Sequence, residues 1–265
     1  MAAIGKFYKD LQLCILKKRL WSSIIGMHEF NGVGYPVYVL RTHMREVESL
    51  PRMLVVAGFH GEEKAGPYAI LKWLESCDPE VNRNYDVSFI PIVNPVGFKK
   101  DQRYGATGEK TNCGFCHPER GDIPSPEAKV IINNIDMLRS MADDGFLSLH
   151  EDATETRYYT YSFEKGRTTP GAFSAILRDT LGRFFKTRLD GEIVEVDASG
   201  RGPLCKDGIV YRHCDGSMED WMFHLGVPKV AVTETPGTYS IDRRIKAHVE
   251  AINIFIEMIT EVVKI

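Results

Sequence analysis

The stretch Met53-Leu-Val-Val-Ala-Gly-Phe-His-Gly-Glu-Glu63 says more about the fold than any other part of this sequence. Its five consecutive apolar residues, Met53 to Ala57, are typical of a strand that is buried on both faces. An amphipathic stretch with helical spacing follows from Ala65 to Ser76. A buried strand that leads directly into a helix predicts an α/β unit, and His60 and Glu63 would leave the carboxyl end of that strand together.

Similar runs recur along the chain and extend this unit into a larger sheet. Further strands are predicted at Pro36 to Leu40, Asp86 to Ile92, Gly145 to Leu149 and Lys229 to Thr233, and further helices at Pro126 to Met141, Pro170 to Leu189 and Asp242 to the C-terminus. Because strands alternate with helices, we predict a three-layer α/β/α fold with a mixed, mostly parallel central sheet. No repeat, low-complexity run or linker divides the sequence, so residues 1–265 are predicted to form a single domain.

Two of the predicted helices begin with a recognisable signal. In Ser125-Pro126 and in Thr169-Pro170 a hydroxyl can cap the first free amides of a helix, and proline suits the first helical position. We therefore expect helices to begin at Pro126 and at Pro170.

The composition indicates a soluble protein and argues against a nucleic-acid partner. The formal net charge of −3 offers no basic field for a phosphate backbone, and no stripe of lysine and arginine interleaved with aromatic residues occurs. The apolar runs are strand-sized, well short of the roughly 18 residues that suggest a membrane-spanning helix. The basic N-terminus lacks a clear secretion signal, and 6 cysteines in 265 residues form no disulfide framework. These features favour the cytoplasm and predict no membrane partner.

His60 and Glu63 are the first candidates for a chemical site. An imidazole nitrogen and a carboxylate oxygen are both good zinc ligands, and a third protein ligand would leave one coordination position open for water. The motif is short, and in a chain with 8 histidines and 36 acidic residues it also arises by chance, as between His43 and Glu46. His43 lies in a charged connection between strands, whereas His60 lies at a strand end with glycines beside it, so the context favours His60.

Two later strands also end in residues that suit such a site. The run Phe146 to Leu149 ends in His150, and the run Val230 to Thr233 ends in Glu234. Strand ends at one edge of a sheet can bring their side chains together. His150 could therefore join His60 on a metal ion, and Glu234 could act on a water molecule nearby.

Taken in order, His60-x-x-Glu63, His150 and Thr233-Glu-Thr-Pro-Gly237 resemble the zinc carboxypeptidase family of the carboxypeptidase A type. The spacing of nine residues from Arg103 to Asn112 adds to the resemblance, because short bacterial members similar to murein peptide amidases share it. The succinylglutamate desuccinylase and aspartoacylase superfamily is similar in its zinc arrangement.

The resemblance implies an enzyme with one zinc ion held by His60, Glu63 and His150. It further implies that Glu234 is the general base and that Arg103 stabilises the oxyanion. Asn112 and Tyr211 are expected to bind the substrate. Zinc would activate water and polarise the scissile carbonyl, and Glu234 would carry the proton to the leaving amine.

One departure concerns recognition of a terminal carboxylate. The family usually has Asn-Arg where this chain has Asn112-Cys113, and a thiol cannot replace a bidentate arginine. Arg120, Arg157 or Arg212 could supply a guanidinium from elsewhere, and the sequence does not choose among them. Glu219 or Asp220 could line the substrate pocket, which would favour a leaving residue with an amine, or could belong to an acidic turn before a helix.

The segment Cys113-Gly-Phe-Cys116-His117 permits three interpretations. It fits the pattern for covalent haem attachment, or its cysteines could be loop residues without a metal. The third possibility is a second zinc site that uses Cys113, Cys116 and His117 together with Cys205 or Cys214. The sequence leaves these alternatives open.

We therefore predict a zinc-dependent metallo-carboxypeptidase or peptide amidase that acts near the end of a small peptide, with murein-type peptides as one substrate class. The alternative is a zinc-dependent N-acyl amino acid deacylase similar to aspartoacylase. A catalytically inactive binding module would be expected to lack a ligand or the base, and all four residues are present. Substrate identity, oligomeric state and pathway are not specified by the sequence.

Overall fold

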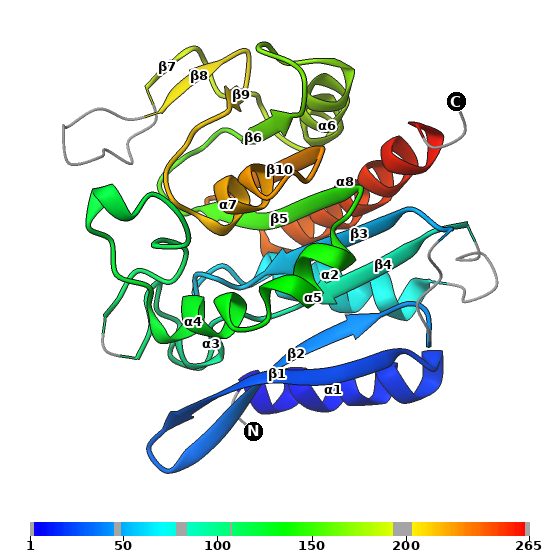
Figure 1. Ribbon diagram of the computed structural model, residues 1–265, viewed down its shortest axis with the longest axis vertical. Coiled ribbons are helices and arrows are strands. Elements are labelled where there is room, and N and C mark those ends of the chain that lie inside the picture. Colours follow the sequence, from blue (N-terminus) through cyan, green and yellow to red (C-terminus); the bar gives the residue numbers. More distant parts are fainter. Residues whose placement is uncertain (1–2, 45–48, 78–83, 107, 193–202, 263–265) are drawn as a thin grey trace.

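The computed structural model describes residues 3–44, 49–77, 84–106, 108–192 and 203–262, and its ten described strands form one sheet (Figure 1). The strands lie in the order β1-β2-β4-β3-β5-β10-β6-β9-β8-β7. Their bounds are β1 (Trp21–Phe30), β2 (Val33–Arg41), β3 (Arg52–Ala57), β4 (Asp86–Ile90), β5 (Gly145–Asp152), β6 (Tyr159–Glu164), β7 (Gly191–Glu192), β8 (Leu204–Lys206), β9 (Ile209–Tyr211) and β10 (Lys229–Pro236).

The parallel strands are concentrated at the centre of the sheet. The neighbours β4, β3, β5 and β10 run parallel to one another, and β6 and β9 form a fourth parallel pair. The remaining five pairings are antiparallel and lie toward the two edges. The predicted mixed sheet is confirmed, although the parallel pairings dominate only in the central block.

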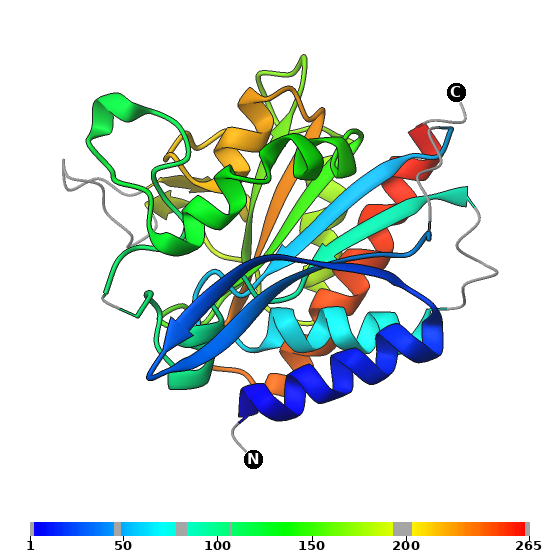
Figure 2. The same cartoon turned by 60° about the horizontal axis from the view of Figure 1, so that its bottom comes forward.

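Helices cover both faces of this sheet (Figure 2). One core packs α1, α2, α6 and α8 against one face, and a second core packs α4, α5 and α7 against the other. Along β3, Met53 and Val55 belong to the first core while Leu54 and Val56 belong to the second, as the period of a doubly buried strand requires. The helices are α1 (Ala3–Lys18), α2 (Ala65–Ser76), α3 (Pro95–Lys100), α4 (Pro126–Ile132), α5 (Ile135–Met141), α6 (Ala172–Gly182), α7 (Met218–His224) and α8 (Ile241–Val262).

The predicted three-layer architecture is therefore confirmed. None of the helices in the described part of the chain is both long and apolar enough to cross a bilayer.

The two predicted helix starts have different outcomes. The Ser125 side chain accepts a hydrogen bond from the Ala128 amide, and Pro126 is the first residue of α4, as expected. The start at Pro170 is wrong, because α6 begins at Ala172 after Gly171, whose amide donates instead to the Glu164 carboxylate at 2.6 Å. The Glu164 carboxylate at the end of β6 thus takes the place of the predicted threonine cap.

Candidate functional site

The loop after β3 can place His60 where it does because two glycines allow close packing. Gly58 has a φ of +68°, a conformation that side-chain-bearing residues rarely adopt. At Gly61 a Cβ atom would lie 2.0 Å from the carbonyl carbon of Gly97 and 2.4 Å from the oxygen of Gln102. The loop that ends at Arg103 therefore packs directly against the His60 loop, and the Gly61 amide donates to the Arg103 carbonyl at 3.3 Å.

The start of α2, which fixes Glu63, is anchored by the strand that carries His150. The Lys64 side chain does not cap the helix. Instead the Ala65 amide donates to Oε1 of buried Glu151 at 2.6 Å, and Arg244 of α8 forms an ion pair with the same carboxylate. Since Glu151 follows His150 directly, the two candidate ligands Glu63 and His150 are held by one connected set of contacts.

His60, Glu63 and His150 converge on one point. Their ligand atoms all lie within 4.8 Å of one another. The Glu63 carboxylate lies between the two rings, with Oε1 2.6 Å from Nδ1 of His60 and Oε2 3.1 Å from Nδ1 of His150. The two imidazoles meet edge to face at 5.1 Å between centroids, and the His150 ring stacks on Phe59. The sequence prediction that three separated residues share one site agrees with this geometry.

The surroundings of His150 favour a positive charge. Burial alone would lower the pKa of His150, but the Glu63 charge and then the Glu219 and Glu234 carboxylates raise it well above its usual value. Burial alone would likewise raise the pKa of Glu63, and the charges of His60 and His150 hold it well below its usual range. The excess of carboxylates therefore favours a cation at this point.

The same three residues also suit a divalent metal ion, because a buried oxygen of the Glu63 carboxylate lacks a hydrogen-bond partner. Glu63 is only 3% exposed, yet its Oε2 has no hydrogen-bond partner. Two imidazoles and one carboxylate are a donor set that zinc accepts, with a further position left for water. His60, Glu63 and His150 could thus hold one metal ion and satisfy a buried group that is otherwise orphaned.

Glu234 lies beside this group on the neighbouring strand. Its Cα is in register with His150 across the parallel pair β10 and β5, and with Tyr159 across the antiparallel pair β10 and β6. Residues in register point to the same face of a sheet, so all three side chains share the face that α7 covers. Glu234 is half-buried there, whereas Thr233 and Thr235 point to the other face, where both contact His248 of α8.

Arg103 reaches the group of His60, Glu63 and His150 from the loop after α3. One terminal nitrogen lies 3.0 Å from Oε1 of Glu63 and 3.4 Å from Oε1 of Glu62. With 31% of its side chain exposed, the guanidinium is at the open side of the group. This is where a residue must lie if it is to meet a substrate carbonyl near the metal.

Asn112 contacts Glu219 rather than open space. Its amide nitrogen donates to Oε2 of Glu219 at 2.9 Å, and its oxygen accepts from the Met218 amide at 3.0 Å. The other oxygen of Glu219 lies 3.3 Å from Nε2 of His150. Burial alone would raise the pKa of Glu219, but His150 and Asn112 lower it to about 2, so this carboxylate is charged.

Glu219 therefore holds the far side of the His150 ring, a role that the sequence did not suggest. The sequence presented it as a residue that could line the substrate pocket. Metal-binding histidines commonly direct their second nitrogen at a carboxylate, which fixes the ring. The Asp220 carboxylate points away from this group and contacts Cys116 and His117.

The structure places Tyr211, the residue expected to bind substrate, away from the His150 group. Tyr211 is in register with Ser162, which contacts Ser174 of α6, so its side chain points to the face opposite His150. Its hydroxyl donates to the Arg167 carbonyl at 3.4 Å. Tyr159 is a tyrosine on the same face of the sheet as His150, and its hydroxyl donates to Asp152 at 2.9 Å. Burial and then the Glu234 charge raise the Tyr159 pKa well above its usual value, and the sequence missed this residue because β6 was not predicted.

The arginine expected at position 113 has no clear replacement. Cys113 directs its thiol at the Lys110 carbonyl. Arg157 donates to the Thr187 carbonyl and Arg212 to the Arg167 carbonyl, and the side chain of Arg120 lies outside the described part. The competing motif at His43 is also separate, since His43 contacts Asp86 and Glu46 lies outside the described residues.

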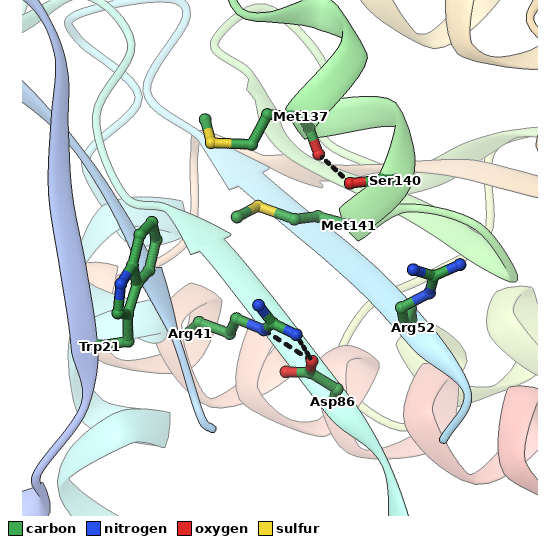
Figure 3. A pocket seen from close by; sticks show the side chains of 7 residues that line it. All are labelled: Trp21, Arg41, Arg52, Asp86, Met137, Ser140 and Met141. Atoms are coloured by element: carbon green, nitrogen blue, oxygen red, sulfur yellow. Dashed lines mark hydrogen bonds and ion pairs between the residues drawn. The ribbon is translucent and has the colours of Figure 1, made fainter. Parts of the chain in front are cut away.

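A cavity of about 140 Å³ lies elsewhere, between β1, β2 and α5 (Figure 3). It is lined by Trp21 and two methionines. Arg41 and Asp86, which also line it, form an ion pair with each other, with 2.6 Å between nitrogen and oxygen. Its remaining polar side chains are Arg52 and Ser140, and the Ser140 hydroxyl donates to the Met137 carbonyl at 2.7 Å, so we do not assign chemistry to this cavity.

The convergent group lies within a part of the chain that matches a known protein family. The profile of the succinylglutamate desuccinylase/aspartoacylase catalytic domain family matches residues 49–165, which include His60, Glu63 and His150. No curated protein matches the sequence.

Two solved structures are similar over nearly the whole chain. A "putative metallopeptidase" from Shewanella amazonensis is 34% identical, with a TM-score of 0.87 over 97% of this chain and 94% of that one. A protein of the same description from Shewanella denitrificans is 33% identical, with a TM-score of 0.85 over 97% and 90% of the two chains.

A more distant structure shares the fold. The metallo-carboxypeptidase from Burkholderia cenocepacia is 12% identical, and the likeness has a TM-score of 0.65 over 96% of this chain and 69% of that one.

Proposed function

This chain belongs to the metallopeptidase family represented by the two Shewanella proteins, within the superfamily of the metallo-carboxypeptidases and the succinylglutamate desuccinylases and aspartoacylases, and on that premise we propose that it is a zinc-dependent amide hydrolase. The proposed reaction is cleavage of an amide bond near the end of a small peptide. The observation that carries the proposal is the convergence of His60, Glu63 and His150 beside Glu234.

In this proposal His60, Glu63 and His150 hold one zinc ion. When bound, zinc supplies Lewis-acid chemistry that lowers the pKa of water and polarises a carbonyl. The Nδ1 atoms of both rings face Glu63, which makes Nδ1 the nitrogen that each histidine offers. Glu219 then orients the His150 ring through Nε2.

Glu234 is the proposed general base. It lies one strand away from His150 and on the same face, so its carboxylate can reach a water molecule that approaches the ligand group. The carboxylate takes one proton from that water as the oxygen attacks the amide carbon. It then returns the proton to the leaving amine, whose bond to carbon breaks.

Arg103 is the proposed donor to the oxyanion. Its guanidinium cannot lose its proton and presents several N–H groups in a fixed plane. Its contacts with Glu63 and Glu62 hold its charge beside the point where the carbonyl would bind. Preorganised donors of this kind stabilise the negative charge that develops on the carbonyl oxygen.

Deacylation of an N-acyl amino acid is the second candidate, because the matching family profile describes a desuccinylase and aspartoacylase domain. Both reactions break an amide bond and use the same base and the same donor. They differ in what flanks that bond: a peptide in one case and a short acyl group in the other. Asn112 is the residue proposed to contact the substrate in either case, through the amide hydrogen that Glu219 leaves free.

A paired substrate assay separates the two reactions. Zinc-loaded protein is incubated with a set of small peptides and with acetyl- and succinyl-amino acids, and the released amines are quantified. Release from peptides alone supports the peptidase, and release from acyl amino acids alone supports the deacylase. Failure of both sets with zinc bound at His60, Glu63 and His150 would contradict the proposed hydrolase activity. A cytoplasmic location remains part of the proposal and rests on the sequence.

A further inference from the structure

A second group of metal-ligand side chains lies beside α7, separate from the group of His60, Glu63 and His150. Cys116 and His117 come from the loop before α4, and Asp220 and His224 come from one face of α7. One ligand atom from each of the four lies within 4.8 Å of every other. This group shares no residue with the candidate catalytic site.

The Asp220 carboxylate is the centre of this group. Oδ2 lies 2.8 Å from Nε2 of His117 and 3.5 Å from Sγ of Cys116, and Oδ1 lies 3.0 Å from Nδ1 of His224. The two imidazole rings meet edge to face with centroids 5.1 Å apart. Four ligands on a tetrahedral zinc ion, bonded at about 2.0–2.3 Å, lie roughly 3.3–3.8 Å from one another. The group needs only small shifts to reach that spacing.

A buried oxygen in the group lacks a partner. Asp220 is fully buried, and its Oδ2 accepts from the Gly216 amide at 2.9 Å as well as contacting His117. Oδ1 has no hydrogen-bond partner, because the nearby Nδ1 of His224 is directed at the backbone oxygen of Asp220 at 2.9 Å. One oxygen of this buried carboxylate is therefore unpaired beside the His224 ring, while the other contacts a thiol and the His117 imidazole, and this arrangement points to a cation.

From this arrangement we propose that Cys116, His117, Asp220 and His224 bind a second, structural zinc ion. Thiolate, imidazole and carboxylate are the three ligand types that zinc takes, and four protein ligands close the coordination sphere. A closed sphere holds the protein together and leaves no position for substrate. His117 also has a partner for its second nitrogen, since Nδ1 lies 3.2 Å from the Glu119 carboxylate.

The proposed ion would tie the loop before α4 to α7, close to the catalytic group. On α7, Glu219 contacts His150 while the next residue, Asp220, faces the second group. The loop carries Asn112, which contacts Glu219, and the Phe115 amide donates to the Gly216 carbonyl at 3.1 Å. Zinc at the second site would therefore keep Asn112, on the loop, in contact with Glu219, on α7.

The test uses the full chain loaded with Zn²⁺ or Co²⁺ and compares Cys116→Ala with Cys113→Ala. The two cysteines belong to one loop, but Cys113 points to the Lys110 carbonyl and serves as the matched control. We expect the wild type and Cys113→Ala to hold two equivalents of zinc and Cys116→Ala to hold one. The cobalt forms of the first two should show a sulfur-to-cobalt charge-transfer band in the near ultraviolet, and Cys116→Ala should lack it.

His150→Ala separates this proposal from the catalytic one. The catalytic group contains no sulfur, so this variant should lose one equivalent of metal and keep the charge-transfer band. If His150→Ala retains all its metal while Cys116→Ala loses the band, the catalytic assignment fails and the second site stands.

Three results would overturn the second site. They are a wild type without the band, a Cys116→Ala protein that keeps it, and a Cys113→Ala protein that loses it. Should Cys116→Ala fail to fold, zinc-edge X-ray absorption of the wild type decides, with a sulfur shell at about 2.3 Å expected and its absence contradicting the proposal.

Discussion

Glu234 on β10 lies directly beside His150 on β5, in register across two parallel strands. Neighbouring strands are about 4.8 Å apart, and residues in register share one face. The proposed base and a proposed metal ligand are therefore positioned by the central sheet rather than by a loop. The flanking threonines point to the opposite face and contact His248, which holds the β10 backbone on both sides of Glu234.

Replacement of Glu234 by glutamine should remove the carboxylate that acts as general base and leave the three proposed metal ligands unchanged. Because general-base catalysis typically contributes 10²–10⁴-fold, we expect kcat to fall by about that factor while the zinc content stays unchanged. Initial rates and metal analysis of the same preparation check both parts. Glu29→Gln, an exposed glutamate on edge strand β1, is the matched control. Wild-type rates in Glu234→Gln would refute its role.

Replacement of Arg103 by alanine should lower kcat more than it raises KM. Loss of one preorganised donor to an oxyanion costs about 2.7–4 kcal/mol, which corresponds to roughly 10²–10³-fold in kcat. Because Arg103 also contacts Glu63, zinc content must be measured in parallel. A variant with full zinc and an unchanged kcat would show that the guanidinium serves only as a partner for the carboxylates.

Replacement of Glu219 by glutamine should weaken metal binding without emptying the site. The new amide side chain would retain an oxygen for Asn112 but would lack the charge that faces Nε2 of His150. Loss of such an outer carboxylate typically costs 10–100-fold in metal affinity or activity, and we expect a loss of that order in zinc affinity. Competition with a chelator measures it, with exposed Glu75→Gln as the control. Unchanged affinity would leave Glu219 as a substrate-pocket residue.

The central fold was predictable because its strands are buried on both faces. The apolar runs at β3, β5 and β10 are short, continuous and bounded by turns, and each ends in a residue that the site brings together. The edge strand β1 was missed because most of its residues are only half-buried or exposed, which leaves no apolar run. The predicted helix from Pro126 to Met141 is divided at Asn133 and Asn134 into α4 and α5.

Contacts between distant parts of the chain could not be predicted. Glu219 reaches His150 only because α7 packs beside β5 and β10, and Tyr159 reaches Glu234 only through an antiparallel pairing. Order along the chain could not show which face of the sheet Tyr211 occupies, because its position on β9 determines that face. Likewise, the loop motif that includes Cys116 gave no hint of Asp220, which lies 104 positions further along the chain.

The buried ring of His248 should make stability sensitive to acid. Burial, and then the charges of Arg244 and His150, lower its pKa from 6.5 to about 3. Between these two values the unfolded chain binds a proton that the folded chain does not. The contribution of the neutral ring is therefore present above pH 6.5 and is lost as the pH falls toward 3.

Replacement of His248 by glutamine, which can still bond both threonines, should reduce this sensitivity. We expect the slope of the free energy of unfolding against pH to fall by up to about 1.4 kcal/mol per pH unit between pH 6.5 and 4. Urea denaturation of wild type and variant across that range measures the slope. Equal slopes would mean that the folded protein protonates His248 as readily as the unfolded chain does.

The most direct test of the catalytic site is a zinc-edge anomalous difference map from crystals of the zinc-loaded protein. We predict a peak bonded at about 2.0–2.2 Å to one ring nitrogen each of His60 and His150 and to the Glu63 carboxylate, with the Glu234 side chain facing it. A map without density between these three residues, or with Glu234 turned away from it, would contradict the assignment of this site.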